Sequence, residues 1–152
     1  MDDSVRYNKI LAVAFGTDLS IKAVKEAVRL AMGLTAKLFV LHVRSPLDIP
    51  HYVEGGAQSR VGAEEIADEI DREERMFLER AVELAGANGI EAETGYVTDL
   101  SPFKAIIRVA QEQHCDLIVM GTRIRHGIPG YFVKSETQKV LANTDIPVVV
   151  VR

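Results

Sequence analysis

The chain has 152 residues, of which 47% are hydrophobic and 26% are charged, close to the averages of soluble globular proteins. This length favours one domain with a sizeable core, and the composition excludes fibrous and disordered classes. The net charge of −4 comes with a small basic surplus after residue 100, too small to predict a nucleic-acid partner.

No targeting or membrane segment is expected. Residues 1–10 are charged and lack the apolar core of a signal peptide. No apolar stretch reaches the roughly 18 residues that would span a bilayer. The single cysteine, Cys115, excludes an internal disulfide, and a buried, inert thiol is its default state. We therefore expect a cytoplasmic protein.

The first third of the chain predicts a strand, a helix and a second strand. Residues 9–14 are almost all apolar, which is typical of a strand buried on both faces. From Ser20 an amphipathic helix follows, with Asp18 or Ser20 as its cap and Gly33 at its end. Residues 37–43 form the next apolar run.

Residues 45–60 have no period and are longer than most connections in compact domains, so we expect a long variable loop. A highly charged helix is predicted over residues 61–87. Glu73 and Glu74 interrupt its apolar stripe, so we expect it to be only partly buried. Its acidic face is most often solvated, and a protein-partner surface is the sharper alternative.

The last part of the chain predicts three more strands and two helices. Strands are expected at residues 90–97, 116–121 and 146–151. Ser101 and Pro102 predict a helix start, with Ser101 as the cap. A basic, glycine-containing loop at 122–131 precedes a helix near 135–142.

Alternation of strands and helices predicts a single α/β domain over residues 1–152, with an open parallel sheet and helices on both faces. Ligands bind such sheets at the carboxyl ends of the strands, where the strand order reverses. The loops at 14–20 and 121–135 would meet there.

Three segments carry a family resemblance. They are residues 116–123 (DLIVMGTR), residues 135–141 (SETQKVL) and residues 147–152 (PVVVVR), supported by residues 10–13, Gly16, Ser20, Ala23 and Ala27. This combination resembles the universal stress protein family over nearly the whole chain outside the loop at 45–60. The resemblance implies a Rossmann-like sheet of five strands in the order 3-2-1-4-5, and commonly a homodimer.

Many members of that family bind ATP through the pattern G-x2-G-x9-G-[ST], in which glycines let backbone N–H groups approach the phosphates. Here Gly121 and Ser135 match, whereas the second and third glycines are Ile124 and Lys134. An aspartate that usually ends the first strand is Phe15. The resemblance therefore implies a degenerate pocket, with ATP as the candidate cofactor and weak or absent binding.

The candidate pocket combines the two loops with one residue of the second strand. Its members are Ala14, Phe15, Gly16, Thr17, Val43, Gly121, Thr122, Arg123, Arg125, Gly127, Gly130, Lys134, Ser135, Glu136 and Thr137. We expect Phe15 to pack under the helix from Ser20 and to block the adenine slot. Arg123, Arg125, His126 and Lys134 form either a phosphate clamp or an ordinary solvated loop. The four histidines are scattered, so no metal site is expected.

Three functions remain open on this basis. The first is a non-enzymatic stress-response or regulatory protein, acting as a homodimer through residues 146–152, whose valines and edge backbone invite a second strand. The second is an ATP-binding switch with slow hydrolysis, in which basic side chains replace the glycine contacts. The third is a structural partner for another protein, using the 45–60 loop and the acidic helix. No catalytic residue is predicted, because neither G-x-S-x-G nor H-E-x-x-H occurs.

Overall fold

The computed structural model describes residues 5–15, 21–46, 62–121 and 131–152, with the backbone alone at 62–67, 70 and 131–135. Five parallel strands form one sheet in the order β3-β2-β1-β4-β5, as the resemblance implies. The strands are β1 (Lys9–Phe15), β2 (Lys37–Arg44), β3 (Ala92–Thr98), β4 (Leu117–Gly121) and β5 (Val148–Val151).

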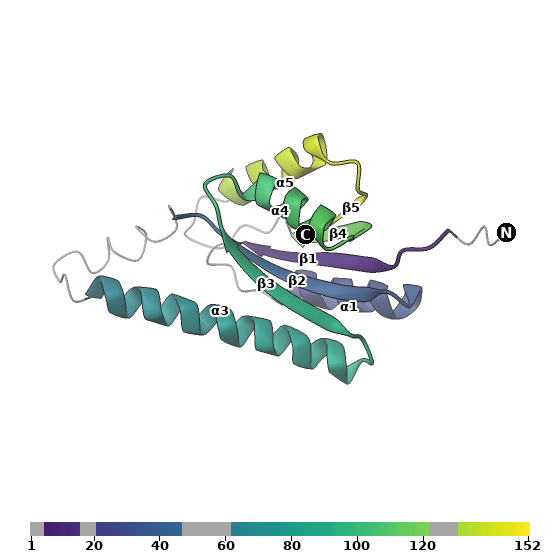
Figure 1. The fold of residues 1–152 in the computed structure, drawn as a ribbon, viewed down its shortest axis with the longest axis horizontal. Coiled ribbons are helices and arrows are strands. Elements are labelled where there is room, and N and C mark those ends of the chain that lie inside the picture. Colours follow the sequence, from purple (N-terminus) through teal and green to yellow (C-terminus); the bar gives the residue numbers. More distant parts are fainter. Residues whose placement is uncertain (1–4, 16–20, 47–61, 122–130) are drawn as a thin grey trace.

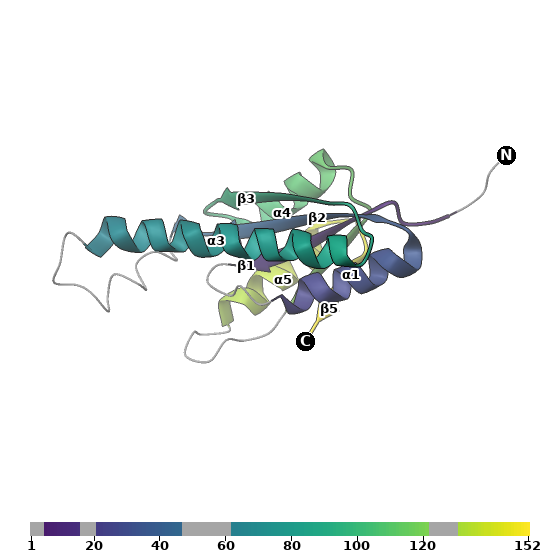
Figure 2. The ribbon, with the colours of Figure 1, turned by 90° about the horizontal axis from the view of Figure 1, so that it is seen from below.

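In the described part of the chain, four helices cover the two faces of this sheet, so the predicted layer arrangement is confirmed. Figure 1 shows α1 (Lys22–Leu34) and α3 (Gly62–Ala87) on one face, and α4 (Pro102–Glu112) and α5 (Tyr131–Asn143) on the other. Figure 2 shows α3 running along the sheet beside β3 and extending past the carboxyl ends of the strands. Over the described residues, no helix is long and apolar enough to cross a membrane.

The core divides into two clusters because successive strand residues point to opposite faces. Even-numbered residues of β1 and most of those of β2, such as Ile10 and Leu38, and odd-numbered residues of β4, such as Val119, pack with α1 and α3. Odd-numbered residues of β1 and β2, such as Leu11, and even-numbered residues of β4, such as Ile118, pack with α4 and α5. The central strands are therefore apolar at nearly every buried position, which explains the long apolar runs in the sequence.

The boundaries of α1 differ from the prediction at both ends. The helix begins at Lys22, with Ile21 as its cap residue and no side-chain capping bond; Asp18 and Ser20 lie outside the described residues. Gly33 lies inside the helix instead of ending it. Thr35 ends the helix in the left-handed conformation, with φ 55°, and its N–H group bonds to the carbonyl of Ala31.

The start of α4 also corrects a prediction. Ser101 is the cap residue, but its side chain makes no capping bond. Instead, the N–H group of Phe103 donates to Oε2 of Glu136 on α5 at 3.0 Å, and the N–H group of Ser101 donates to Oδ1 of Asp99 at 2.8 Å. A carboxylate from a neighbouring helix therefore satisfies the free amide that the serine was expected to satisfy.

We predict that Thr35→Gly stabilises the protein. A residue with a Cβ in the left-handed region destabilises the fold by about 1–2 kcal/mol, and glycine removes this strain because it has no Cβ. Glycine also has more conformational entropy in the unfolded state, which offsets part of the gained stability. The free energy of unfolding should rise by about 1 kcal/mol in urea denaturation. Thr35→Ala is the matched control and should gain much less, because alanine keeps the Cβ. An equal gain from both variants would contradict this explanation.

We also predict that Cys115 reacts slowly in the folded protein. The side chain is buried, and burial raises the pKa of its thiol to about 11, with Asp116 and Glu93 adding to the rise and Lys9 opposing it. The reactive thiolate is therefore scarce at pH 8. Labelling by a disulfide reagent at pH 8 should be at least about 100-fold slower in buffer than in urea. Rapid labelling of the native protein would show that the thiol is accessible.

A packed ligand edge and the buried polar contacts beside it

The candidate ligand edge lies where the strand order reverses, between β1 and β4. These strands are paired in register from Ile10 opposite Leu117 to Val13 opposite Met120, so their carboxyl ends are adjacent. β1 continues to Phe15 beside β2, while β4 ends at Gly121, beside Val151 of β5. Open parallel sheets bind ligands where the strand order reverses, so this edge stays the candidate ligand site.

Three of the four described strand residues of the candidate pocket, Ala14, Phe15 and Val43, are buried, whereas Gly121 at the end of β4 is partly exposed. Ala14 belongs to the cluster under α1 and α3. Phe15, 8% exposed, and Val43 belong to the opposite cluster, with Ile106 of α4 and Val140 of α5. The expectation that Phe15 packs under the helix after β1 is therefore wrong. Strand alternation sends position 15 to the other face of the sheet.

The two described pocket residues on α5 make contacts within the protein. Besides bonding to Phe103, the buried carboxylate of Glu136 pairs through Oε1 with Nζ of Lys139 at 3.3 Å. Lys139 also lies over the Phe103 ring, 5.7 Å from its centroid. The hydroxyl of Thr137 donates to the carbonyl of Gly121 at 3.3 Å. Both residues thus attach α5 to neighbouring elements, and neither presents a free side chain to a ligand.

The remaining pocket residues can be placed only in part. Gly16, Thr17, Thr122, Arg123, Arg125, Gly127 and Gly130 lie outside the described residues. Lys134 and Ser135 lie in the first turns of α5, which begins at Tyr131, four residues before the predicted start. Helical backbone suits any residue with a Cβ, so Lys134 does not occupy a position that only glycine can adopt.

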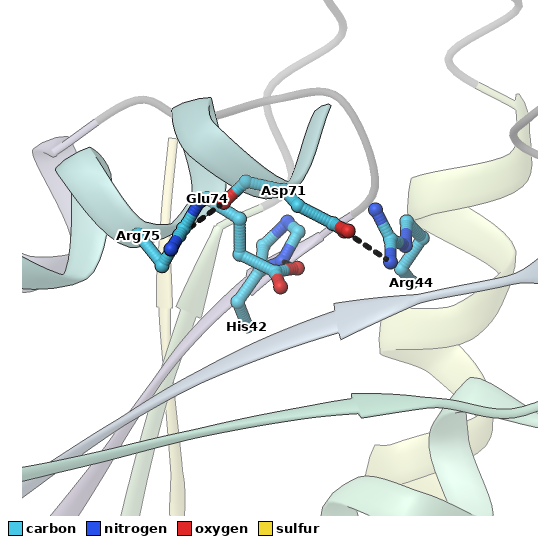
Figure 3. Close-up of polar contacts among 5 residues, drawn as sticks. All are labelled: His42, Arg44, Asp71, Glu74 and Arg75. Atoms are coloured by element: carbon cyan, nitrogen blue, oxygen red, sulfur yellow. Dashed lines mark hydrogen bonds and ion pairs between the residues drawn. The ribbon is translucent and has the colours of Figure 1, made fainter. Parts of the chain in front are cut away.

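Sequence reasoning missed a buried polar pair beside this edge. His42 of β2 and Glu74 of α3 are 1% and 3% exposed, and Nδ1 of the imidazole is hydrogen-bonded to Oε2 of the carboxylate. The ring of Phe77 lies next to the imidazole, with the centroids 6.2 Å apart. Figure 3 shows the two polar side chains facing one another between the strand and the helix.

Two arginines continue this contact toward solvent. Arg44 donates from Nη2 to Oδ1 of the exposed Asp71 at 3.3 Å, and Nε of Arg75 donates to the carbonyl of Asp71 at 3.4 Å. The Arg44–Asp71 pair, together with His42 and Glu74, attaches the middle of α3 to the last residues of β2, whereas the Arg75 contact lies within α3. His42 and Arg44 lie one residue on either side of Val43, which is a member of the candidate pocket.

The sequence did contain a signal for this pair. Glu74 falls on the same helical stripe as Phe77, Leu78 and Ala81, all of which are buried. A charged residue on a buried stripe needs a polar partner. His42 is the one polar residue within the buried run of β2 from Leu38 to Val43. The expected break in the stripe at Glu73 and Glu74 is wrong for Glu74, which is buried, whereas Glu73 is exposed.

Among the described residues, no group of three or more histidine, cysteine, aspartate or glutamate side chains could hold a metal ion. His42 and Glu74 form a pair without a third ligand of this kind in the described part of the chain. The contact that the structure shows for this pair is a hydrogen bond between β2 and α3.

Comparison with known proteins identifies the family. A family model described as the universal stress protein family matches residues 6–152. Universal stress protein YxiE of Bacillus subtilis is 34% identical over 154 residues, spanning 96% of this chain and 99% of that protein.

Solved structures share the fold. Universal stress protein UspA from Lactobacillus plantarum has a TM-score of 0.71 at 24% identity, covering 98% of this chain and 100% of that one. A universal stress protein in complex with cAMP has a TM-score of 0.65 at 23% identity, covering 97% and 98%. A universal stress protein from Archaeoglobus fulgidus in complex with dAMP has a TM-score of 0.58 at 21% identity, covering 98% and 100%. With the five-stranded order β3-β2-β1-β4-β5, these matches establish that the chain belongs to the universal stress protein family.

Proposed function

We propose that this protein is a non-enzymatic regulatory member of the family, which acts as a homodimer and binds ATP weakly or not at all. The observation that carries the proposal is the burial of Phe15 at the end of β1. Many members have an aspartate at this position, where it helps to hold the adenine end of the nucleotide. The phenyl ring supplies no acceptor there, and it packs into the core.

The energy of this packing opposes a rearrangement that would open the pocket. Burying a phenylalanine side chain stabilises a protein by roughly 2–3 kcal/mol, so turning Phe15 outward would cost about that much. Val43, Glu136 and Thr137 are likewise engaged within the fold. A nucleotide would therefore have to displace existing contacts or rely on backbone groups alone.

An ATP-binding or adenine-nucleotide-binding switch is the second candidate. The complexes of two fold neighbours with cAMP and with dAMP support it. The helical backbone at Lys134 supports it as well, because this substitution for glycine is sterically acceptable and adds a positive charge. Slow hydrolysis of ATP would belong to this alternative.

The buried state of Cys115 supports the reducing, cytoplasmic setting that we propose for either function.

The ATP affinity of designed variants tests the first proposal. Isothermal titration calorimetry of the wild type with Mg·ATP should show no submillimolar binding. The triple variant Phe15→Asp, Ile124→Gly and Lys134→Gly should gain measurable affinity, because it restores the acceptor and both glycines. Phe15→Leu is the matched control, since it keeps an apolar side chain and should gain nothing. Submillimolar binding by the wild type would favour the switch, and titration with cAMP would then identify the preferred nucleotide.

The proposed homodimer would use the β5 edge, through Ile146 to Arg152. β5 pairs with β4 on one side only in the described structure. Val150 is 38% exposed, which is unusual for a valine in the interior of a strand. An uncharged valine strand with a free edge favours pairing with a second copy.

We predict that Val150→Asp weakens the dimer. A carboxylate at this edge would face its own copy across a two-fold axis, and like charges placed opposite each other are destabilising. Light scattering after size exclusion should give twice the chain mass for the wild type and the single chain mass for the variant at low micromolar concentration. Met76→Asp is the matched control, because it adds the same charge at an exposed site on α3. A wild-type monomer, or a dimer unaffected by Val150→Asp, would refute this interface.

A further inference from the structure

β3 forms the other edge of the sheet, and in the described structure it pairs only with β2. Leu38 donates its N–H to the carbonyl of Glu91, and Asp99 donates its N–H to the carbonyl of Arg44. Backbone groups of alternate residues point to opposite sides of a strand, so the odd-numbered residues of β3 bond to β2. Ala92, Thr94, Tyr96 and Thr98 therefore direct their N–H and C=O groups away from the sheet.

A groove of about 720 Å³ runs between β3 and α3, next to these outward-facing groups. Its apolar surface comes from Leu78 and Val82 on the helix and from Tyr96 on the strand. Tyr96 is 66% exposed, and Val82 is also exposed. The unpaired edge of β3 and the apolar groove are thus continuous. A strand added at this edge would pair with β3 through its backbone and place every second side chain in the groove.

Three charged residues line the groove: Arg75, Glu79 and Glu83. Glu79 and Glu83 line it, four residues apart on α3, where like charges repel each other. Within the described part of the chain, neither of them forms an ion pair. In contrast, the glutamates that precede and begin β3 are already paired, Glu91 with Lys37 and Glu93 with Lys9. The two glutamates outnumber the one arginine, so the groove has a net negative charge beside the strand.

The composition of β3 argues against self-association at this edge. Residues 88–103 contain no lysine or arginine. Pairing two β3 edges would bring the acidic walls of two copies together, which is unfavourable. Residues 94–98 carry no charge and no proline, so the half of the strand beside the groove lacks the usual protection against pairing.

We propose that the β3 edge and its groove bind an extended, basic segment of a partner protein, which adds a strand to the sheet. Backbone groups of the segment pair with Thr94, Tyr96 and Thr98. Its lysine or arginine side chains reach Glu79 and Glu83, and apolar side chains lie against Val82 and Tyr96. This site is separate from the nucleotide pocket and from the β5 edge, so it can be occupied in a homodimer.

A synthetic ten-residue peptide that alternates valine or threonine with lysine is the probe. Fluorescence anisotropy should show saturable binding to the full-length protein at low salt. Thr94→Pro removes one outward N–H group without removing a bond to β2, and it should weaken binding at least about tenfold. Thr94→Val is the matched control, which keeps the N–H group and should bind as the wild type does. Circular dichroism and thermal unfolding confirm that each variant is folded.

Two further measurements separate strand addition from simple charge attraction. The double variant Glu79→Gln and Glu83→Gln should weaken binding several-fold and reduce its salt dependence. A peptide of the same sequence with N-methylated alternate amides should fail to bind, because it cannot pair with the strand. Equal binding by the methylated peptide, or by Thr94→Pro, would overturn the proposal. A change in oligomeric state on Thr94→Pro alone would also overturn it, because it would show that a second copy occupies the edge.

Discussion

The structure depends on the burial of β1 on both faces. Residues Ile10 to Ala14 are almost inaccessible to solvent, and alternate side chains enter the two core clusters. Such a strand requires cover on both faces and a strand at each edge, and right-handed crossovers in a parallel sheet provide both. The same strand also forms one side of the point where the strand order reverses. The core and the candidate ligand edge are therefore consequences of one constraint.

Two buried carboxylates then determine how helices attach to this core. Glu74 bonds to His42 and fixes α3 against β2, while Glu136 bonds to the first turn of α4 and fixes α5 against it. Either carboxylate would cost several kcal/mol if left buried without its partner, so these contacts favour one arrangement of the helices over slipped alternatives. Glu136 illustrates how a residue in the expected ligand set can serve the fold instead.

The ligand edge and the two sheet edges together suggest a protein that acts through association. Among the described residues of the candidate pocket, Ala14, Phe15 and Val43 are buried in the core. The two outer strands differ in character: β5 is a short valine strand, whereas β3 borders an acidic groove. Our proposals assign the first edge to a second copy and the other edge to a basic partner. Regulation would then depend on which partners the sheet edges bind, more than on nucleotide.

The sequence by itself determined the family, the five strands, and their order through the resemblance. These features follow from local hydrophobic period and motif spacing, which need no knowledge of distant contacts. Only the tertiary structure decided the face on which Phe15 packs and the partner of Glu74. It also decided that Glu136, and not the side chain of Ser101, accepts the hydrogen bond from the first turn of α4. Each depends on residues far apart in the chain, such as His42 with Glu74 and Phe103 with Glu136. A buried carboxylate and an exposed one look alike in sequence, because burial is a property of what packs against a residue.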